Sequence, residues 1–397
     1  MDSNPSSTLE AQPESGTPDP GTPDRGTPDG LRQPKDIPPT EIFSELQRGV
    51  LGQDEALRFV SVAIYKHTTG RVSGNLLLVG NSGTGKTTIM NNIQRLYDTL
   101  PEYRSFRALT ILNANLLVDS DRTEFRPDRM LRSIEQRARL VVSEEPTADE
   151  LQQAMERATV CIDEIDKMTS ILGGKPNPLG VVLQQGLLTL MEGERVAYQT
   201  HAWEDGKERP VTLRINTERM MFVCGGAFEG LYDQVYNRVT KPGSGVKLRS
   251  EARRTADGKV RIDTIFELGE FLRVKDLFEY GMVPQFMARF DKIVLMKELP
   301  REVLEQILLK SYDSPFVRSR RFFETLDIDL EIEPLASALI SEKATKESRT
   351  GARALRDVFS KVINRYEFDP WNSGGLSEED GRTRLVIDAD RVREALA

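Results

Sequence analysis

Short apolar runs and amphipathic stretches alternate along the chain between residues 38 and 298. The apolar runs are NLLLVG (75–80), TVCIDEID (159–166), RMMFVCGG (219–226) and DKIVLM (291–296). Runs of this kind predict strands that are covered on both faces, as in a parallel sheet. Stretches with helical spacing separate them, for example TTIMNNIQRLYDTL (87–100). The pattern therefore predicts an α/β fold with a doubly wound parallel sheet.

The pattern changes after Leu299-Pro300. Helical spacing dominates in 301–326, 333–346 and 350–369, around the short strand-like pieces DIDLEI and TRLVID. A region of this length is typical of a separate small domain. We therefore expect a large α/β domain at 38–298 and a small, mainly helical lid domain at 299–397.

The first 37 residues have a different composition. They are rich in Pro, Ser, Gly, Thr and Asp, and a pentapeptide occurs three times within 16–30, as GTPDP, GTPDR and GTPDG. Such a segment buries too little apolar surface to offset the entropy of ordering it. The sequence therefore predicts a disordered tail at 1–37, either a solubilising tether or a partner-binding segment.

Charge and composition restrict the class of partner. The formal net charge of −8 argues against nucleic acid and anionic membranes as partners. No apolar run approaches the roughly 20 residues that span a bilayer, and the N-terminus has no signal-peptide core. Cys161 and Cys224 lie in strand-like runs, which favours buried reduced thiols, and two histidines without a Cys pair argue against zinc. We expect a cytoplasmic protein.

A glycine-rich segment follows the first apolar run directly. It satisfies G-x-x-x-x-G-K-[ST], and its glycines permit a tight loop whose amides point at phosphate oxygens. The following helix presents its positive end to the same anion. In this loop the lysine reaches the β- and γ-phosphates and the threonine hydroxyl ligates Mg²⁺. The sequence predicts nucleotide binding by Gly80, Asn81, Ser82, Gly83, Thr84, Gly85, Lys86, Thr87 and Thr88.

Two acids end the second apolar run. Asp163 is expected to hold Mg²⁺ with Thr87, because a phosphate loop needs a carboxylate on a neighbouring strand. Glu164, one residue further, is expected to polarise the attacking water. Lys86, Thr87, Asp163 and Glu164 together predict Mg²⁺-dependent hydrolysis of ATP.

Several stretches resemble the AAA+ ATPases of the ClpX type, which are hexameric protein unfoldases. They are PTEIFSELQRGVLGQDEALRFVSVAIYKH (39–67), CIDEIDKM (161–168), GVVLQQGLLTLMEG (180–193), MFVCGGAFEGL (221–231), YGMVPQFMARFDKIV (280–294) and TGARALRDV (350–358). The likeness runs from about residue 38 to residue 397. It implies an AAA+ fold, ATP and Mg²⁺ as ligands, and a homo-oligomeric ring, expected to be a hexamer, that acts on a protein substrate.

The resemblance also assigns residues outside the phosphate loop. It places Val50 and Leu51 against the adenine base. It makes Arg289 an arginine finger that reaches the γ-phosphate of a neighbouring subunit, which accords with its position after a Pro-containing turn at the sheet edge. It makes Arg353 the lid arginine that contacts the phosphates and couples nucleotide state to the angle between the domains.

The sequence departs from the ClpX type in three places. The amino-terminal zinc-binding domain is replaced by the repeat-bearing tail. The aromatic pore loop is replaced by VDSDRTEFRPDRM (118–130), in which Phe125 is either a paddle against substrate or an ordinary packed side chain. The region 237–279 contains no I-G-F-like tripeptide for docking a ClpP-type peptidase, and its KPGSG and TADG segments predict turns.

Two functions remain open at this point. The first is an ATP-dependent protein unfoldase or remodelling ATPase whose ring drives loops near 119–129 and 169–180 along a pore. The second is an ATP-regulated scaffold or regulatory module that acts on one dedicated partner without general unfolding or peptidase coupling. A nucleic-acid motor is a third class, and the net charge argues against it.

Overall fold

The computed structural model describes residues 32–71, 74–254, 260–346, 351–379 and 381–397. Its centre is a parallel sheet in the order β13-β1-β10-β5-β2. The strands are β1 (Leu76–Val79), β2 (Leu109–Asn113), β5 (Thr159–Asp163), β10 (Met221–Gly226) and β13 (Lys292–Leu295). The four strands predicted from apolar runs are confirmed, and the edge strand β2 is an addition. The α/β fold class is also confirmed.

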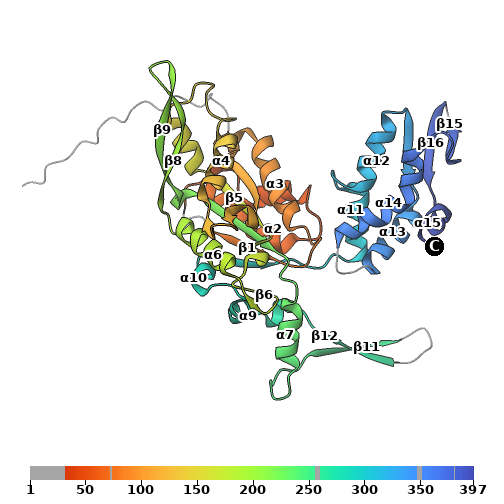
Figure 1. Ribbon diagram of the computed structural model, residues 1–397. Helices are drawn as coiled ribbons and strands as arrows, with labels where there is room; N and C mark the ends of the chain where they lie inside the picture. The colour runs from red at the N-terminus through yellow and green to blue at the C-terminus, as the bar shows by residue number, and fades with distance from the viewer. Residues whose placement is uncertain (1–31, 72–73, 255–259, 347–350, 380) are drawn as a thin grey trace, which may run out of the picture.

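Helices cover both faces of this sheet (Figure 1). Alternate residues of β1 enter two cores, since Leu77 and Val79 pack on one face and Leu76 and Leu78 on the other. The second face packs against α1 (Pro39–Gln47), α2 (Asp54–Thr68) and α3 (Lys86–Thr99). The first packs against α4 (Pro127–Ala138), α5 (Ala148–Glu156), α6 (Pro178–Met191) and α7 (Leu231–Thr240). Three shorter helices complete this part: α8 (Leu268–Phe271), α9 (Val274–Tyr280) and α10 (Pro284–Met287).

Four antiparallel hairpins project from the connections between these elements. They are β3 (Val118–Asp119) with β4 (Glu124–Phe125), β6 (Ile171–Leu172) with β7 (Lys175–Pro176), β8 (Arg195–Glu204) with β9 (Lys207–Asn216), and β11 (Arg249–Arg254) with β12 (Val260–Ile265). The long β8–β9 hairpin packs on α4, where Glu135 accepts hydrogen bonds from Tyr198 and Thr200, each at 2.5 Å. These contacts fix the hairpin against the sheet domain.

The C-terminal part has its own core and lies beside the sheet, in blue in Figure 1. It contains α11 (Arg301–Lys310), α12 (Pro315–Glu324), α13 (Pro334–Lys346), α14 (Ala352–Phe368) and α15 (Ala389–Leu396). A small sheet in the order β14-β16-β15 joins them, from β14 (Ile328–Ile332), β15 (Leu376–Glu379) and β16 (Arg382–Ile387). The helices predicted from periodicity are present here.

Two segments predicted from the sequence are not among the residues that the structure describes. The GTPD repeats and the TADG turn lie outside the described residues. Ile37, the last residue assigned to the tail, is buried in the core formed with α1 to α3. Among the described residues, no helix has the length and apolar character needed to cross a membrane.

Candidate nucleotide site

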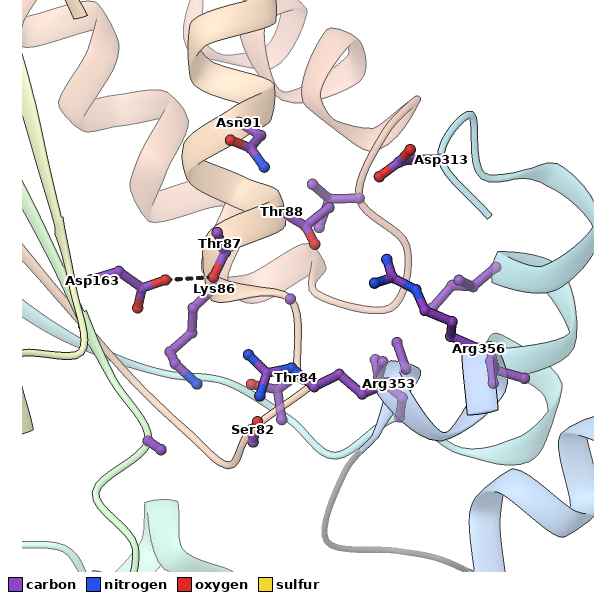
Figure 2. Close-up of a pocket in the computed structure, with 18 of the residues that line it drawn as sticks. Ser82, Thr84, Lys86, Thr87, Thr88, Asn91, Asp163, Asp313, Arg353 and Arg356 are labelled. Atoms are coloured by element: carbon purple, nitrogen blue, oxygen red, sulfur yellow. Dashed lines mark hydrogen bonds between the residues drawn. The ribbon is translucent and has the colours of Figure 1, made fainter. Parts of the chain in front are cut away.

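A cleft of about 1040 Å³ lies between the glycine-rich loop and the C-terminal helices (Figure 2). Of the residues predicted from the sequence, twelve line it: Val50, Leu51, Ser82, Gly83, Thr84, Gly85, Lys86, Thr87, Thr88, Asp163, Glu164 and Arg353. Gly80 and Asn81 belong to the same loop without lining the cleft, and Arg289 lies elsewhere. The structure thus brings together residues from four regions of the sequence.

The loop runs from the end of β1 to the start of α3. Gly83 and Gly85 adopt positive φ values of 77° and 100°, where a side chain would be strained. Lys86, the first residue of α3, folds back on the loop and donates hydrogen bonds to the carbonyls of Gly80 at 2.5 Å and Asn81 at 2.9 Å. Burial lowers the pKa of Lys86, and the nearby charges of Asp163 and Asp166 raise it in part. A bound polyphosphate would place an anion in direct contact with this buried ammonium, whose present hydrogen bonds go to two carbonyls.

Thr87 and Asp163 meet on the other side of the loop. The Thr87 hydroxyl donates a hydrogen bond to Oδ2 of Asp163 at 2.5 Å (Figure 2). The strand order explains this proximity, because β5 is separated from β1 only by β10 and both strands end at the same edge. A hydroxyl and a carboxylate oxygen at hydrogen-bonding distance match the hard oxygen ligands that Mg²⁺ prefers. The side chains present therefore fit that ion.

Glu164 is held by two donors. Lys167 Nζ lies 2.8 Å from Oε1, and the side-chain amide of Asn113 donates to Oε2 at 2.5 Å. The hydrogen bond from Lys167 and then that from Asn113 lower the pKa of Glu164, so this carboxyl is ionised at neutral pH. Its backbone is left-handed, with φ of 59°, which is uncommon for a residue other than glycine. Such a conformation at the end of β5 is typical of functional sites.

The C-terminal part contributes two arginines from one face of α14. Arg353 and Arg356 are one turn apart, both line the cleft, and Figure 2 shows them extending from that part toward the loop and α3. Sequence reasoning identified Arg353 but missed Arg356, although the spacing of three residues places both on one helical face. Val50 and Leu51 line the cleft together with the lid-side residues Leu299 and Ile307, which gives this wall an apolar part.

Gln53 was also missed by sequence reasoning. Its side chain is 1% exposed and donates hydrogen bonds to the carbonyls of Thr84 at 2.9 Å and Lys297 at 2.7 Å. Its carbonyl oxygen accepts from the Lys297 amide at 3.0 Å. Gln53 therefore joins the glycine-rich loop to the segment that leads into the lid. Asn81 makes a second such connection, since its side chain donates to Glu298 at 3.1 Å.

Arg289 lies outside the cleft of its own chain. It follows α10 and forms an ion pair with Glu192, the residue at the C-terminal end of α6. Both side chains are 43% exposed. The guanidinium is therefore accessible from outside the subunit.

A parallel sheet with this loop after β1 and an Asp-Glu pair after β5 defines a nucleoside triphosphatase with a phosphate-binding loop. The sequence profile of the AAA domain (Cdc48 subfamily) matches residues 71–293. This chain belongs to that family, and it is an ATP-binding ATPase of the AAA+ class.

Proteins with similar sequences belong to the same class of ATPase, and the similarity covers most of this chain. The ATP-dependent Clp protease ATP-binding subunit ClpX of Bacteroides thetaiotaomicron is 28% identical over 347 residues, which cover 83% of this chain and 76% of the relative. The protein of the same name from Azotobacter vinelandii is 28% identical over 353 residues, covering 83% and 74%. That from Borrelia duttonii is 25% identical over 356 residues, covering 85% and 76%. The resemblance to the ClpX type is thereby confirmed, as a distant relationship.

Proposed function

We propose that this protein is an ATP-driven, ring-forming remodeller of proteins. The observation that carries the proposal is the division of the site. Thr87, Asp163 and Glu164 meet in one cleft, while Arg289 faces outward with an exposed guanidinium. A site with its phosphate-binding and water-activating groups on one chain and an arginine turned outward is suited to completion by a neighbouring subunit.

The geometry supports a specific set of roles within one subunit. Thr87 and Asp163 would hold Mg²⁺, which when bound neutralises charge on the phosphates. The loop amides, Lys86 and Arg353 bind the phosphate oxygens. Glu164 accepts a proton from the attacking water, the γ-phosphoryl group passes to that water, and ADP leaves. Each Glu164 oxygen has one hydrogen-bond donor at present and keeps a second lone pair that can accept from the water.

The role proposed for Arg289 is compatible with a closed ring. A contact in which one chain presents Arg289 and the next presents its cleft is heterologous, and such contacts form a ring when the rotation between subunits closes. We propose a homohexamer, as the resemblance to the ClpX type implies, in which Val50 and Leu51 contact the adenine. The ion pair with Glu192 would hold Arg289 until a neighbour's nucleotide displaces it.

Loops near the centre of such a ring would act on the substrate. Phe125 is half-buried and packs against α6, where a side-chain carbon on Gly186 would lie 2.3 Å from its ring. This packing supports the structural alternative for Phe125 over a free paddle. The exposed tip of its hairpin, Ser120 to Glu124, is polar. Ile171 and Leu172 in β6 are 45% and 55% exposed, and we propose that this second loop supplies the apolar grip.

We also propose the domain division and location expected from the sequence. Residues 38–298 form the large ATPase domain and residues 299–397 the lid, in keeping with the separate core at 299–392. The protein acts in the cytoplasm, and ATP turnover rotates the lid against the large domain.

The test uses a stably folded fluorescent reporter protein that carries an exposed tag. Its unfolding in the presence of ATP is measured as the loss of its fluorescence. We expect the wild-type protein to unfold the reporter, and Ile171→Ser, a change outside the cleft, to turn over ATP without unfolding it. Normal turnover with no unfolding of any reporter favours the alternative, a regulatory scaffold with one dedicated partner.

A further inference from the structure

The lid touches the glycine-rich loop through the backbone. The amide of Ala352 donates a hydrogen bond to the carbonyl of Gly83 at 3.0 Å. Ala352 is the first residue of α14, and its amide is one of those that a helix leaves without an internal partner. The first turn of the lid helix is therefore held by the loop that binds phosphate.

Gly351 makes this close approach possible. Its φ of 49° and ψ of −130° lie where residues with side chains are strained. A side-chain carbon there would lie 2.6 Å from the carbonyl oxygen of Gly83 and 2.8 Å from the carbonyl carbon. Both are backbone atoms and cannot rotate away. The position thus excludes side chains on two independent grounds, conformation and space.

The loop is held on its other sides as well. Its carbonyls at Gly80 and Asn81 accept from Lys86, and that of Thr84 accepts from Gln53. The carbonyl of Gly83 is the one that binds the lid helix. Because the amides of such a loop face the bound phosphate, a change at the Gly83 peptide would reach α14 through this hydrogen bond.

We propose that the Gly83–Ala352 contact, with Gly351 as the residue that permits it, is a positioning contact that holds Arg353 over the phosphates. Arg353 follows Ala352 directly, so the hydrogen bond fixes the backbone from which its guanidinium extends (Figure 2). The proposal rests on the proposed function in one respect, since it takes Arg353 to be a phosphate ligand. It adds that Arg353 acts from a backbone anchored to the loop.

The first test compares two glycines of the C-terminal part that share a positive φ. Gly374 has φ of 75° and open space around it, so Gly374→Ala introduces the strain of a positive φ without a close contact. Gly351→Ala introduces the strain at its own φ and ψ together with the close contact with Gly83. We expect kcat/KM for ATP to fall about 10- to 100-fold in Gly351→Ala, the size of effect that a small misplacement causes, and by less than about twofold in Gly374→Ala. Equal effects of the two variants would overturn the proposal.

The second test breaks the contact at its donor. Proline is accepted at the first position of a helix, so Ala352→Pro can keep α14 while it deletes the N–H and places a ring carbon where the hydrogen faced the Gly83 carbonyl, 3.0 Å from the nitrogen. Circular dichroism and the unfolding temperature check that the variant is folded. We expect it to lower kcat/KM about 10-fold or more in the wild-type background and to have no further effect on an Arg353→Ala variant.

The combined variant separates this proposal from the proposed function. If the losses in Ala352→Pro and Arg353→Ala multiply, or if Ala352→Pro alone has wild-type kinetics, the contact does not act through Arg353 and the inference is wrong. If Arg353→Ala itself retains wild-type kcat/KM, the role of Arg353 in the proposed function is what fails.

Discussion

The side-chain amide of Asn113, at the end of β2, donates a hydrogen bond to Oε2 of Glu164 at 2.5 Å. Lys167 occupies the other carboxylate oxygen at 2.8 Å. Each oxygen keeps a further lone pair for the attacking water, so both donors can stay in place, and both stabilise the ionised carboxylate. Asn113 therefore acts on the proposed base from the neighbouring strand.

Removal of this amide should raise basal ATP turnover. In Asn113→Ala the pKa of Glu164 moves back toward its ordinary value, which makes the carboxylate a stronger base, so we expect turnover to increase roughly threefold to tenfold. Phosphate release in steady state measures it. Asn115→Ala, two residues further and exposed, is the matched control and should behave as wild type. A fall in turnover would mean that Asn113 orients Glu164 for catalysis instead of restraining it.

Glu164→Gln should separate binding from hydrolysis. The amide keeps the size of the side chain but cannot take a proton, so we expect turnover to fall about 10²- to 10⁴-fold while ATP affinity is retained. Binding of a fluorescent ATP analogue and phosphate release measure the two properties. Glu144→Gln, an exposed change outside the cleft, provides the control. Hydrolysis at the wild-type rate in Glu164→Gln would show that another group activates the water.

The parts of the fold and of the site that could be predicted share one property. The residues that indicate each of them are neighbours in the sequence. β1 and the glycine-rich loop form an unbroken segment, and Asp163 and Glu164 end an apolar run. The β8–β9 hairpin gave no such signal, because its inward positions include Thr200 and Ala202, which weaken the alternation of apolar residues. A polar group buried by a tertiary contact leaves little trace in a pattern of hydrophobicity.

Gln53 and Asn113 are two residues of the site whose contacts could not be predicted from the sequence. Gln53 bonds to Lys297, 244 positions away, and Asn113 to Glu164, 51 positions away. Neither contact follows from local spacing, because each depends on how the strands and the lid segment are arranged. Arg356 differs, since its distance of three residues from Arg353 was visible in the sequence.

Gln53 should matter for stability as well as for the site. Gln53→Leu keeps the volume but leaves two carbonyls and one amide without their partner, so we expect a loss of about 2–4 kcal/mol and weaker ATP binding. Urea unfolding of the large domain and nucleotide titration measure these effects. The exposed Gln185→Leu is the control. Unchanged stability and affinity in Gln53→Leu would contradict the connection between loop and lid segment.

His67 should make folding sensitive to acid. It is 5% exposed, its Nε2 lies 3.2 Å from the Arg157 carbonyl, and burial lowers its pKa to about 4 from an ordinary 6.5. Above pH 6.5 neither state is protonated. Between about 6.5 and 4 the unfolded chain takes up a proton that the folded chain does not, so stability falls as pH falls, by about 3 kcal/mol in total.

The measurement is the free energy of unfolding across this pH range. His67→Gln should flatten the dependence, whereas His201→Gln, at an exposed position, should leave it as in wild type. The quantity compared is the change of the unfolding free energy with pH, so a loss of stability that is equal at all pH values in His67→Gln does not affect the result. If His67→Gln shows the same pH dependence as the wild type, His67 is not the source of the acid sensitivity.

The central claim is that each ATP site is shared between two subunits, and mixing two inactive variants tests it most directly. Lys86→Ala removes the phosphate ligand and Arg289→Ala the group offered to the neighbour, and each alone should lose nearly all turnover. In an equal mixture, roughly a quarter of the interfaces pair an intact loop with an intact arginine, so turnover should recover to about that fraction.

Lys86→Ala mixed with Glu164→Gln is the control, because both groups belong to one chain and no interface regains a complete site. Native mass spectrometry establishes that mixed rings have formed. The account predicts recovery in the Lys86→Ala and Arg289→Ala mixture alone. Mixed rings of that pair without any recovered turnover would contradict it.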